Sequence, residues 1–179
     1  MAVSSVEINS GLELMINLLV WPVLWFVAIF LHELGHAIMY QIAFSCSDWK
    51  IVLGSGRPIF KSRKLEINTL FFVGGLFIPQ RKYEAKRLRL NLVSLGGSFA
   101  NVIIILCVLA ISHFLSGLDF YRIHGAIIFL IETILSAALI ANVFMFIVSI
   151  LPMTYSFGIL KGKPSDGLRI LRRFTSSKK

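Results

Sequence analysis

The amino-acid sequence predicts an α-helical polytopic membrane protein with three spans and a small membrane-associated β region between the first two. Three observations predict this class. Apolar residues make up 56% of the 179 residues and charged residues only 15%, whereas soluble domains contain about 45–50% and about 25% of these. The apolar residues gather in three long stretches, and the basic residues lie beside those stretches. We expect a single domain over residues 1–179.

The first apolar stretch, about 12–43, is long enough to cross a bilayer. An α-helix rises about 1.5 Å per residue and the hydrocarbon core is about 30 Å thick, so about 20 residues are sufficient. The extra length predicts a helix that continues into the cytoplasmic interface, and Pro22 is a position where it can kink. No basic start or small-residue cleavage site is present, so we expect a retained helix rather than a signal peptide.

The segment 45–91 contains the predicted β region. Its β-like runs are 50–53, 58–60 and 65–73, and its turns are 54–56 and 61–64. Runs of β-branched and aromatic residues between such turn clusters are typical of short strands. The segment therefore predicts a small sheet or hairpin at the membrane, and residues 83–92 predict a basic, amphipathic approach to the second span.

The second and third spans are predicted at about 92–118 and 126–151. Of the 18 Lys and Arg residues, all but Arg122 lie in 50–89 or 161–179. The positive-inside rule places both groups in the cytoplasm and the N-terminus outside. We therefore expect a multi-pass protein of the cell membrane, surrounded by lipid, with a basic cytoplasmic tail over 161–179. Because the basic residues flank apolar spans, no nucleic-acid partner is expected.

The first span carries His32-Glu33-Leu34-Gly35-His36, which matches the pattern HExxH. Residues four apart share a helix face, so both imidazoles can reach one cation with Glu33 beside them. Catalytic zinc usually has three protein ligands and an open position for water, and Glu33 is placed to take a proton from that water and deliver it to the leaving amine. The pattern also occurs by chance, but two histidines and a glutamate inside a membrane span are costly and indicate function.

A third metal ligand must come from elsewhere in the chain. The other carboxylates and histidines are few: Glu7, Glu13, Asp48, Glu66, Glu84, Asp119, Glu132, Asp166, His113 and His124. His113, Asp119 and His124 are predicted at the outer ends of the spans, whereas His36 lies in the inner part of the first span. Asp166 follows the third span on the cytoplasmic side and can reach the metal if the chain folds back. The alternative is a solvated turn aspartate, because Asp-Gly is a common turn pair.

Four motifs, in order, resemble the site-2 protease family of intramembrane zinc metalloproteases. They are HExxH at 32–36, the glycine-bearing segment with Gly54, Gly56 and Gly74-Gly75, the segment Gly96-Gly97-Ser98-Phe99-Ala100-Asn101, and Leu151-Pro152 followed by Asp166-Gly167. Together they extend over nearly the whole chain, which makes them more specific than HExxH alone.

The resemblance implies a three-helix transmembrane metalloprotease core. It implies that zinc is held by His32, His36 and Asp166 and that Glu33 is the catalytic base. It also implies that Asn101 lies near the metal, where its amide contacts substrate or the developing oxyanion. The alternative for Asn101 is a helix-helix hydrogen bond, worth about 0.6–2 kcal/mol in a bilayer.

The chain departs from the pattern of this family at two positions and in one interval. Ser98 stands where the family usually has proline, and Ser149 stands where it usually has asparagine. Ser149 keeps the ability to make a polar contact. The interval from Pro152 to Asp166 is longer than usual, so a longer loop must return Asp166 to the metal.

These features predict a zinc-dependent endopeptidase that hydrolyses a peptide bond of a membrane-spanning or membrane-associated protein near the cytoplasmic face. A strand edge within 50–73 is predicted to hold the substrate extended. One alternative is a catalytically inactive, metal-binding homologue that acts as a membrane binding or regulatory protein. A metal transporter is another, but it requires ligands distributed over the spans. Glu132, an acidic residue well inside a span, either pairs with a neighbouring helix or lines a water path.

Overall fold

The computed structural model describes residues 10–80, 86–117 and 125–176. Its three long helices are α1 Ser10–Phe44, α2 Arg87–Ser116 and α3 Gly125–Ile150. Each is long and apolar enough to cross a membrane, so the three predicted stretches are confirmed as long apolar helices. α2 begins at Arg87 rather than near residue 92, because part of the predicted basic approach is already helical.

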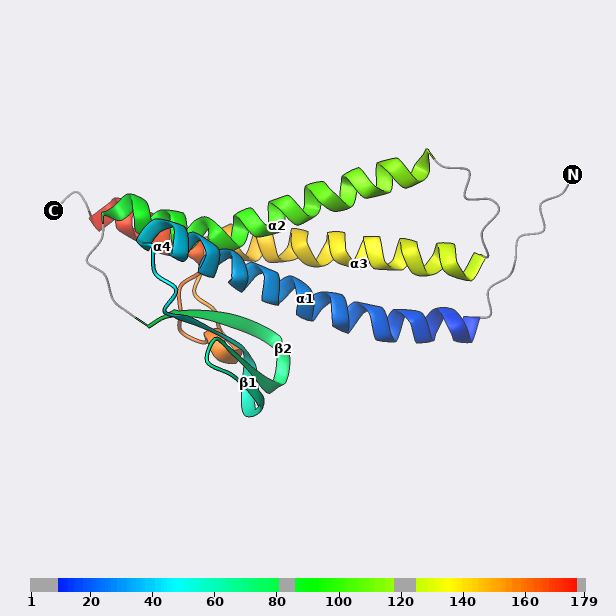
Figure 1. The fold of residues 1–179 in the computed structure, drawn as a ribbon, viewed down its shortest axis with the longest axis horizontal. Helices are drawn as coiled ribbons and strands as arrows, with labels where there is room; N and C mark the ends of the chain where they lie inside the picture. Colours follow the sequence, from blue (N-terminus) through cyan, green and yellow to red (C-terminus); the bar gives the residue numbers. More distant parts are fainter. Residues whose placement is uncertain (1–9, 81–85, 118–124, 177–179) are drawn as a thin grey trace, which may run out of the picture.

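The three helices lie along one another, and successive helices run in opposite directions (Figure 1). The end of α1, the beginning of α2 and the end of α3 therefore lie together, at the end of the bundle that also carries the β-strands. We call this the sheet end. α1 and α2 pack closely because both have glycine at the contact: a Cβ added to Gly96 would lie 2.5 Å from the carbonyl oxygen of Gly35. Small residues allow this approach in membrane helix pairs.

The sheet has two antiparallel strands, β1 Trp49–Lys61 and β2 Leu65–Pro79, and it lies between α1 and α2 in the chain. The predicted turn at 61–64 is confirmed, because β1 ends and β2 begins there. The predicted turn at 54–56 falls inside β1, where Gly54 and Gly56 have φ angles of 74° and 96°. The register against β2 changes at these glycines: residues 51–53 advance together with 65–67, whereas residues 58–61 run against 66–68, so the chain bends sharply between the two parts of β1.

β2 also continues beyond its predicted end at residue 73 to Pro79. The continuation is paired with β1, where Ile51 has partners at both Leu65 and Phe77. Ile51 and Leu53 are almost fully buried and pack with Ile29 of α1. The sheet is thereby fixed against the part of α1 that carries the HExxH motif.

The chain after α3 is folded rather than a free basic tail. It forms a short 3₁₀ turn, η2 Gly158–Leu160, and a helix, α4 Asp166–Thr175. α4 packs against the beginning of α2 at the sheet end (Figure 1). Arg173 makes this contact specific, because its Nη1 donates to the carbonyl oxygen of Leu90 and to the side-chain oxygens of Asn91 and Ser94, at 2.9–3.1 Å.

Every Lys and Arg of the described residues belongs to the sheet, the beginning of α2, the loop after α3 or α4. All of these elements lie at the sheet end. At the other end of the bundle, the described residues of the three helices include no lysine or arginine. This separation is the arrangement on which the positive-inside prediction depends, and the orientation itself stays a prediction.

Candidate metal centre

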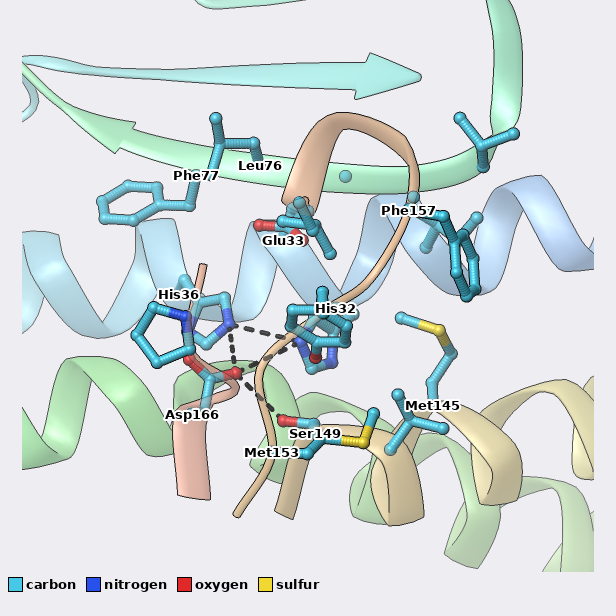
Figure 2. Close-up of a pocket in the computed structure, with 18 of the residues that line it drawn as sticks. His32, Glu33, His36, Leu76, Phe77, Met145, Ser149, Met153, Phe157 and Asp166 are labelled. Atoms are coloured by element: carbon cyan, nitrogen blue, oxygen red, sulfur yellow. Dashed lines mark hydrogen bonds and ion pairs between the residues drawn. The ribbon is translucent and has the colours of Figure 1, made fainter. Parts of the chain in front are cut away.

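His32 and His36 lie one turn apart on α1 and face Asp166, the first residue of α4 (Figure 2). The ligand atoms of these three side chains all lie within 4.8 Å of one another. Oδ2 of Asp166 is 3.1 Å from Nε2 of His36 and 3.6 Å from Nε2 of His32. All three residues are buried, with exposed fractions of 4%, 5% and 7%. The group could hold a metal ion.

The partners of the imidazole Nδ1 atoms orient both rings so that Nε2 faces the site. The Asn101 amide nitrogen donates to the carbonyl oxygen of Asn142 at 3.1 Å, so the Asn101 side-chain oxygen faces His32. That oxygen can only accept, and His32 Nδ1 therefore donates to it at 3.1 Å. The carbonyl oxygen of Val93 likewise accepts from His36 Nδ1 at 2.7 Å. Both histidines consequently face the site with Nε2, and Nδ1 of His36 also lies 3.3 Å from the backbone N–H of Gly97.

This arrangement brings three possible metal-ligand atoms together. The two Nε2 atoms are 3.2 Å apart, and the Asp166 carboxylate oxygen lies beside both of them. Lone pairs at this separation repel one another, and burial strengthens the repulsion because water does not screen it. The geometry is stable only with a positive charge between the three atoms, supplied by a shared proton or by a cation.

The space at these atoms is kept open by a glycine of α2. A Cβ added to Gly97 would lie 2.5 Å from Nε2 of His32 and 2.7 Å from Nε2 of His36. Any side chain at this position would therefore occupy the place where the imidazole nitrogens converge. The Gly96-Gly97 pair thus has two uses: one glycine contacts α1 and the next leaves room for a ligand of the histidines.

Asp166 is oriented by a chain of two buried serines. Ser149 Oγ donates to Oδ2 of Asp166 at 2.9 Å. Because its hydrogen is used there, Ser149 accepts from Ser98 Oγ at 3.1 Å. The two positions at which the chain departs from the pattern of the resembled family are therefore hydrogen-bonded to each other and to the predicted metal ligand. The other oxygen of Asp166 faces Arg169 at 3.5 Å.

The long interval before Asp166 folds back on itself. Thr154 and Pro164 form a β-bridge, and Tyr155 and Lys163 pair through a backbone hydrogen bond of 3.0 Å. Ser165 then begins α4, since its Oγ accepts from the backbone N–H of Leu168 at 3.2 Å. The alternative of a solvated turn aspartate is wrong, because a serine N-cap followed by Asp at the first helical position starts a helix and buries the carboxylate.

The Asp166 carboxyl is held in its ionised form. Burial by itself would raise its pKa, but the hydrogen bonds with the His32 and His36 imidazoles outweigh burial and hold the pKa well below its usual range. Metal ligands of this type must be deprotonated. The environment of Asp166 therefore keeps it in the state that binds a cation.

A cavity of about 490 Å³ adjoins the three residues. Glu33 lines it together with them, and β2 forms one wall with residues 72–77 while α3 contributes Phe144 and Val148. A Cβ added to Gly75 would lie 2.5 Å from the Cγ of Glu33, so the strand passes directly over this side chain. Trp25 ties β2 to α1, because its indole N–H donates to the carbonyl oxygen of Phe72 at 3.1 Å.

Tyr155 also lines the cavity and was not expected from the sequence. Burial raises the pKa of its phenol to about 12, and the negative charges of Asp166 and Glu33 act in the same direction. The hydroxyl therefore remains a neutral hydrogen-bond donor at physiological pH. A tyrosine in a loop gives no sequence signal of this role, since only the return of the chain brings it to the cavity.

Asn101 is brought to the site but does not line the cavity. It is fully buried, with its oxygen on His32 and its nitrogen on the carbonyl of Asn142. These contacts join α2 to α3 and to α1, as expected for the alternative in which Asn101 makes helix-helix hydrogen bonds, and the contact with His32 also orients its imidazole. The contact of Asn101 with substrate stays a prediction.

The other candidate ligands are not part of the cluster. Among the described residues the only group with metal-ligand spacing is His32, His36 and Asp166. Asp48 and Glu66 lie on or beside the sheet, where Glu66 pairs with Lys50 at 2.6 Å, and Glu132 is exposed on α3. Four further candidates lie outside the described residues: Glu7, Glu84, Asp119 and His124.

Comparison with known proteins gives no relative. No family model, no curated protein and no solved structure matches the chain. The functional interpretation therefore depends on the motifs in the sequence and on the geometry of the site.

Proposed function

We propose that the chain is a zinc-dependent intramembrane endopeptidase of the site-2 protease type. The observation that carries the proposal is the convergence of three buried ligand atoms from His32, His36 and Asp166, beside Glu33, in a cavity between helices that can span a membrane. Two imidazoles and a carboxylate are a common ligand set of catalytic zinc, which leaves a fourth position for water or substrate.

The residues of the site fit such an ion. Each imidazole has its Nδ1 proton bound by a fixed acceptor, which is the usual second contact of a zinc-ligating histidine. Gly97 leaves the convergence point free of side chains. The residues that line the cavity include no thiol, because Cys46 and Cys107 lie elsewhere. Nitrogen and carboxylate ligands suit zinc, although other divalent ions also accept them.

The chemistry that zinc supplies at such a site is Lewis acidity, which polarises a peptide carbonyl and acidifies a water molecule. Glu33 accepts a proton from water at its carboxylate and passes it to the nitrogen of the departing amine. Asn101 and the Val93 carbonyl contact the imidazoles at Nδ1, which leaves both Nε2 atoms facing the ion. Tyr155, neutral and within the cavity, is placed to donate a hydrogen bond to an oxygen that gains negative charge.

The substrate would lie extended along β2. Residues 72–77 of β2 line the cavity. The part of β2 next to the candidate site therefore lies mostly C-terminal to the segment 50–73, in which the substrate-binding edge was predicted. A peptide that adds to a strand gains backbone hydrogen bonds and loses its helical ones, which exposes the bond to be cut.

The experiment that tests the proposal measures cleavage of tagged single-span membrane proteins by the purified chain in liposomes. Wild type should cut at least one member of the panel, and Glu33→Gln should abolish cutting while zinc remains bound. Glu13→Gln is the matched control, because Glu13 lies in the first turn of the same helix, away from the cavity. It should cut like wild type.

The inactive metal-binding homologue makes a different prediction for this experiment. It retains zinc in all three variants and cuts nothing, including substrates that are already unfolded at the cleavage site. Cutting that persists in Glu33→Gln would contradict the assignment of the base. The serine chain from Ser98 to Asp166 gives no support to inactivity, because it holds the third ligand in place.

A further inference from the structure

Glu132 is an exposed carboxylate on a helix that can span a membrane. It lies seven residues after α3 begins at Gly125, about 10 Å along the helix axis, and the residues just before it are apolar. It has no hydrogen bond or ion pair with the described residues. Acidic side chains in membrane spans almost always face the bundle interior or a water-filled cavity. The outward position of Glu132 therefore indicates a partner within the membrane.

The surface around Glu132 leads to the candidate active site. The residues four, eight and twelve positions after Glu132 are also exposed: Ser136, Ile140 and Phe144. We call these four residues the Glu132 ridge. Rows of residues four apart are the ridges that pack into the grooves of another helix. Phe144 lines the cavity, and so does Val148, the next residue in the same row. A helix that packs along the ridge would thus arrive at Glu33 and the metal ligands.

We propose that the Glu132 ridge docks the transmembrane helix of the substrate and that Glu132 pairs with a lysine or arginine of that helix. This inference rests on the proposed endopeptidase activity. Twelve to sixteen residues separate Glu132 from Phe144 and Val148, which corresponds to about 18–24 Å along α3. The basic residue of the substrate lies at about this distance from the bond to be cut, on the side away from the sheet end.

Charge complementarity favours a substrate over a second copy of the chain. In the described parts of the spans, the lysines and arginines are Arg87 and Arg89, in the first turn of α2 at the sheet end, and His113 lies in the last turn of the same helix. A second copy in the same orientation has no described lysine or arginine at the depth of Glu132. A single-span protein with one basic residue in its membrane segment supplies this charge.

The test uses photo-crosslinking, so that binding is measured without cleavage. A photo-reactive amino acid replaces Ser136 in the Glu33→Gln variant, reconstituted in liposomes. The probe is a tagged single-span helix of leucine and alanine with one lysine at the depth of Glu132, compared with the same helix carrying leucine there. The lysine helix should crosslink about threefold to thirtyfold more efficiently, the range expected for polar contacts between membrane helices.

Charge exchange decides whether Glu132 is responsible. Glu132→Gln should remove the preference, Glu132→Lys should transfer it to a probe with glutamate in place of lysine, and Glu13→Gln should change nothing. Equal crosslinking of both probes, or crosslinks between two copies of the chain in place of the probe, would overturn the proposal. Wild type that cuts substrates without regard to a basic residue would overturn it while leaving the endopeptidase intact. A lysine-dependent crosslink without cutting of any substrate would support the docking surface and count against the activity.

Discussion

At the scale of single residues, the site depends on hydrogen bonds that lie behind the ligands. Asn101 and the Val93 carbonyl orient the imidazoles of the histidines, and Ser149 orients the carboxylate of Asp166. The HExxH pattern was sufficient to predict His32 and His36 as a ligand pair, because the two residues are only four positions apart in the sequence. Ser149 was recognised only as a departure from a family pattern, since its partners are 51 and 17 residues away in the chain.

Gly97→Ala should abolish zinc binding although the helix is retained. Alanine stabilises a helix interior by about 1 kcal/mol relative to glycine, but here its Cβ would lie 2.5 Å from Nε2 of His32. Gly117→Ala is the control, because the nearest atom to its Cβ is 3.5 Å away. Zinc content and circular dichroism of both variants check the prediction. Full zinc occupancy in Gly97→Ala would place the ion elsewhere.

Ser149→Ala should weaken zinc affinity about 10–100-fold, the usual effect of removing a hydrogen bond to a metal ligand. Competition with a zinc chelator of known affinity measures this change. Ser149→Asn restores the residue type of the resembled family and should recover part of the affinity. Ser136→Ala, at an exposed serine of the same helix, should leave it unchanged. An equal loss in both alanine variants would point to a general effect on α3.

At the scale of elements, long apolar stretches and local turn residues were sufficient to predict the three spans and the turn at 61–64. Contacts between distant segments were not predictable in this way. Gly54 and Gly56 were predicted as a turn between two strands, and they lie at a bend inside one long strand, because both sides of the bend pair with β2. The segment 161–179 was predicted only as a basic tail, but Arg173 and the Ser165 cap fold part of it into α4 and bury Asp166.

Arg173→Ala should detach α4 from α2 and lower zinc occupancy. The side chain supplies hydrogen bonds from a charged, half-buried donor, and their loss should cost about 1.5–3 kcal/mol of docking energy. Arg172→Ala is the matched control, because the neighbouring arginine is exposed. Limited proteolysis of the segment 166–176 and zinc content should change only in Arg173→Ala. Protection of this segment in both variants would show that α4 is held by other contacts.

At the scale of the whole molecule, the described basic residues gather at one end of an apolar bundle, and the candidate site lies toward that end. If the sheet end faces the cytoplasm, the cut occurs near the cytoplasmic face. A fluorescent protein fused after residue 179 should therefore fluoresce in cells, whereas alkaline phosphatase fused there should be inactive. Active phosphatase at that position would reverse the orientation and place the site near the outer face.

The central claim is that His32, His36 and Asp166 together hold one zinc ion, and zinc content of the purified protein tests it most directly. Elemental analysis should find close to one zinc per chain in wild type and in Glu33→Gln. His36→Ala should retain little zinc, because a single lost ligand leaves only two. Wild type purified without chelators that contains no stoichiometric metal, or His36→Ala that binds as much as wild type, would contradict the account.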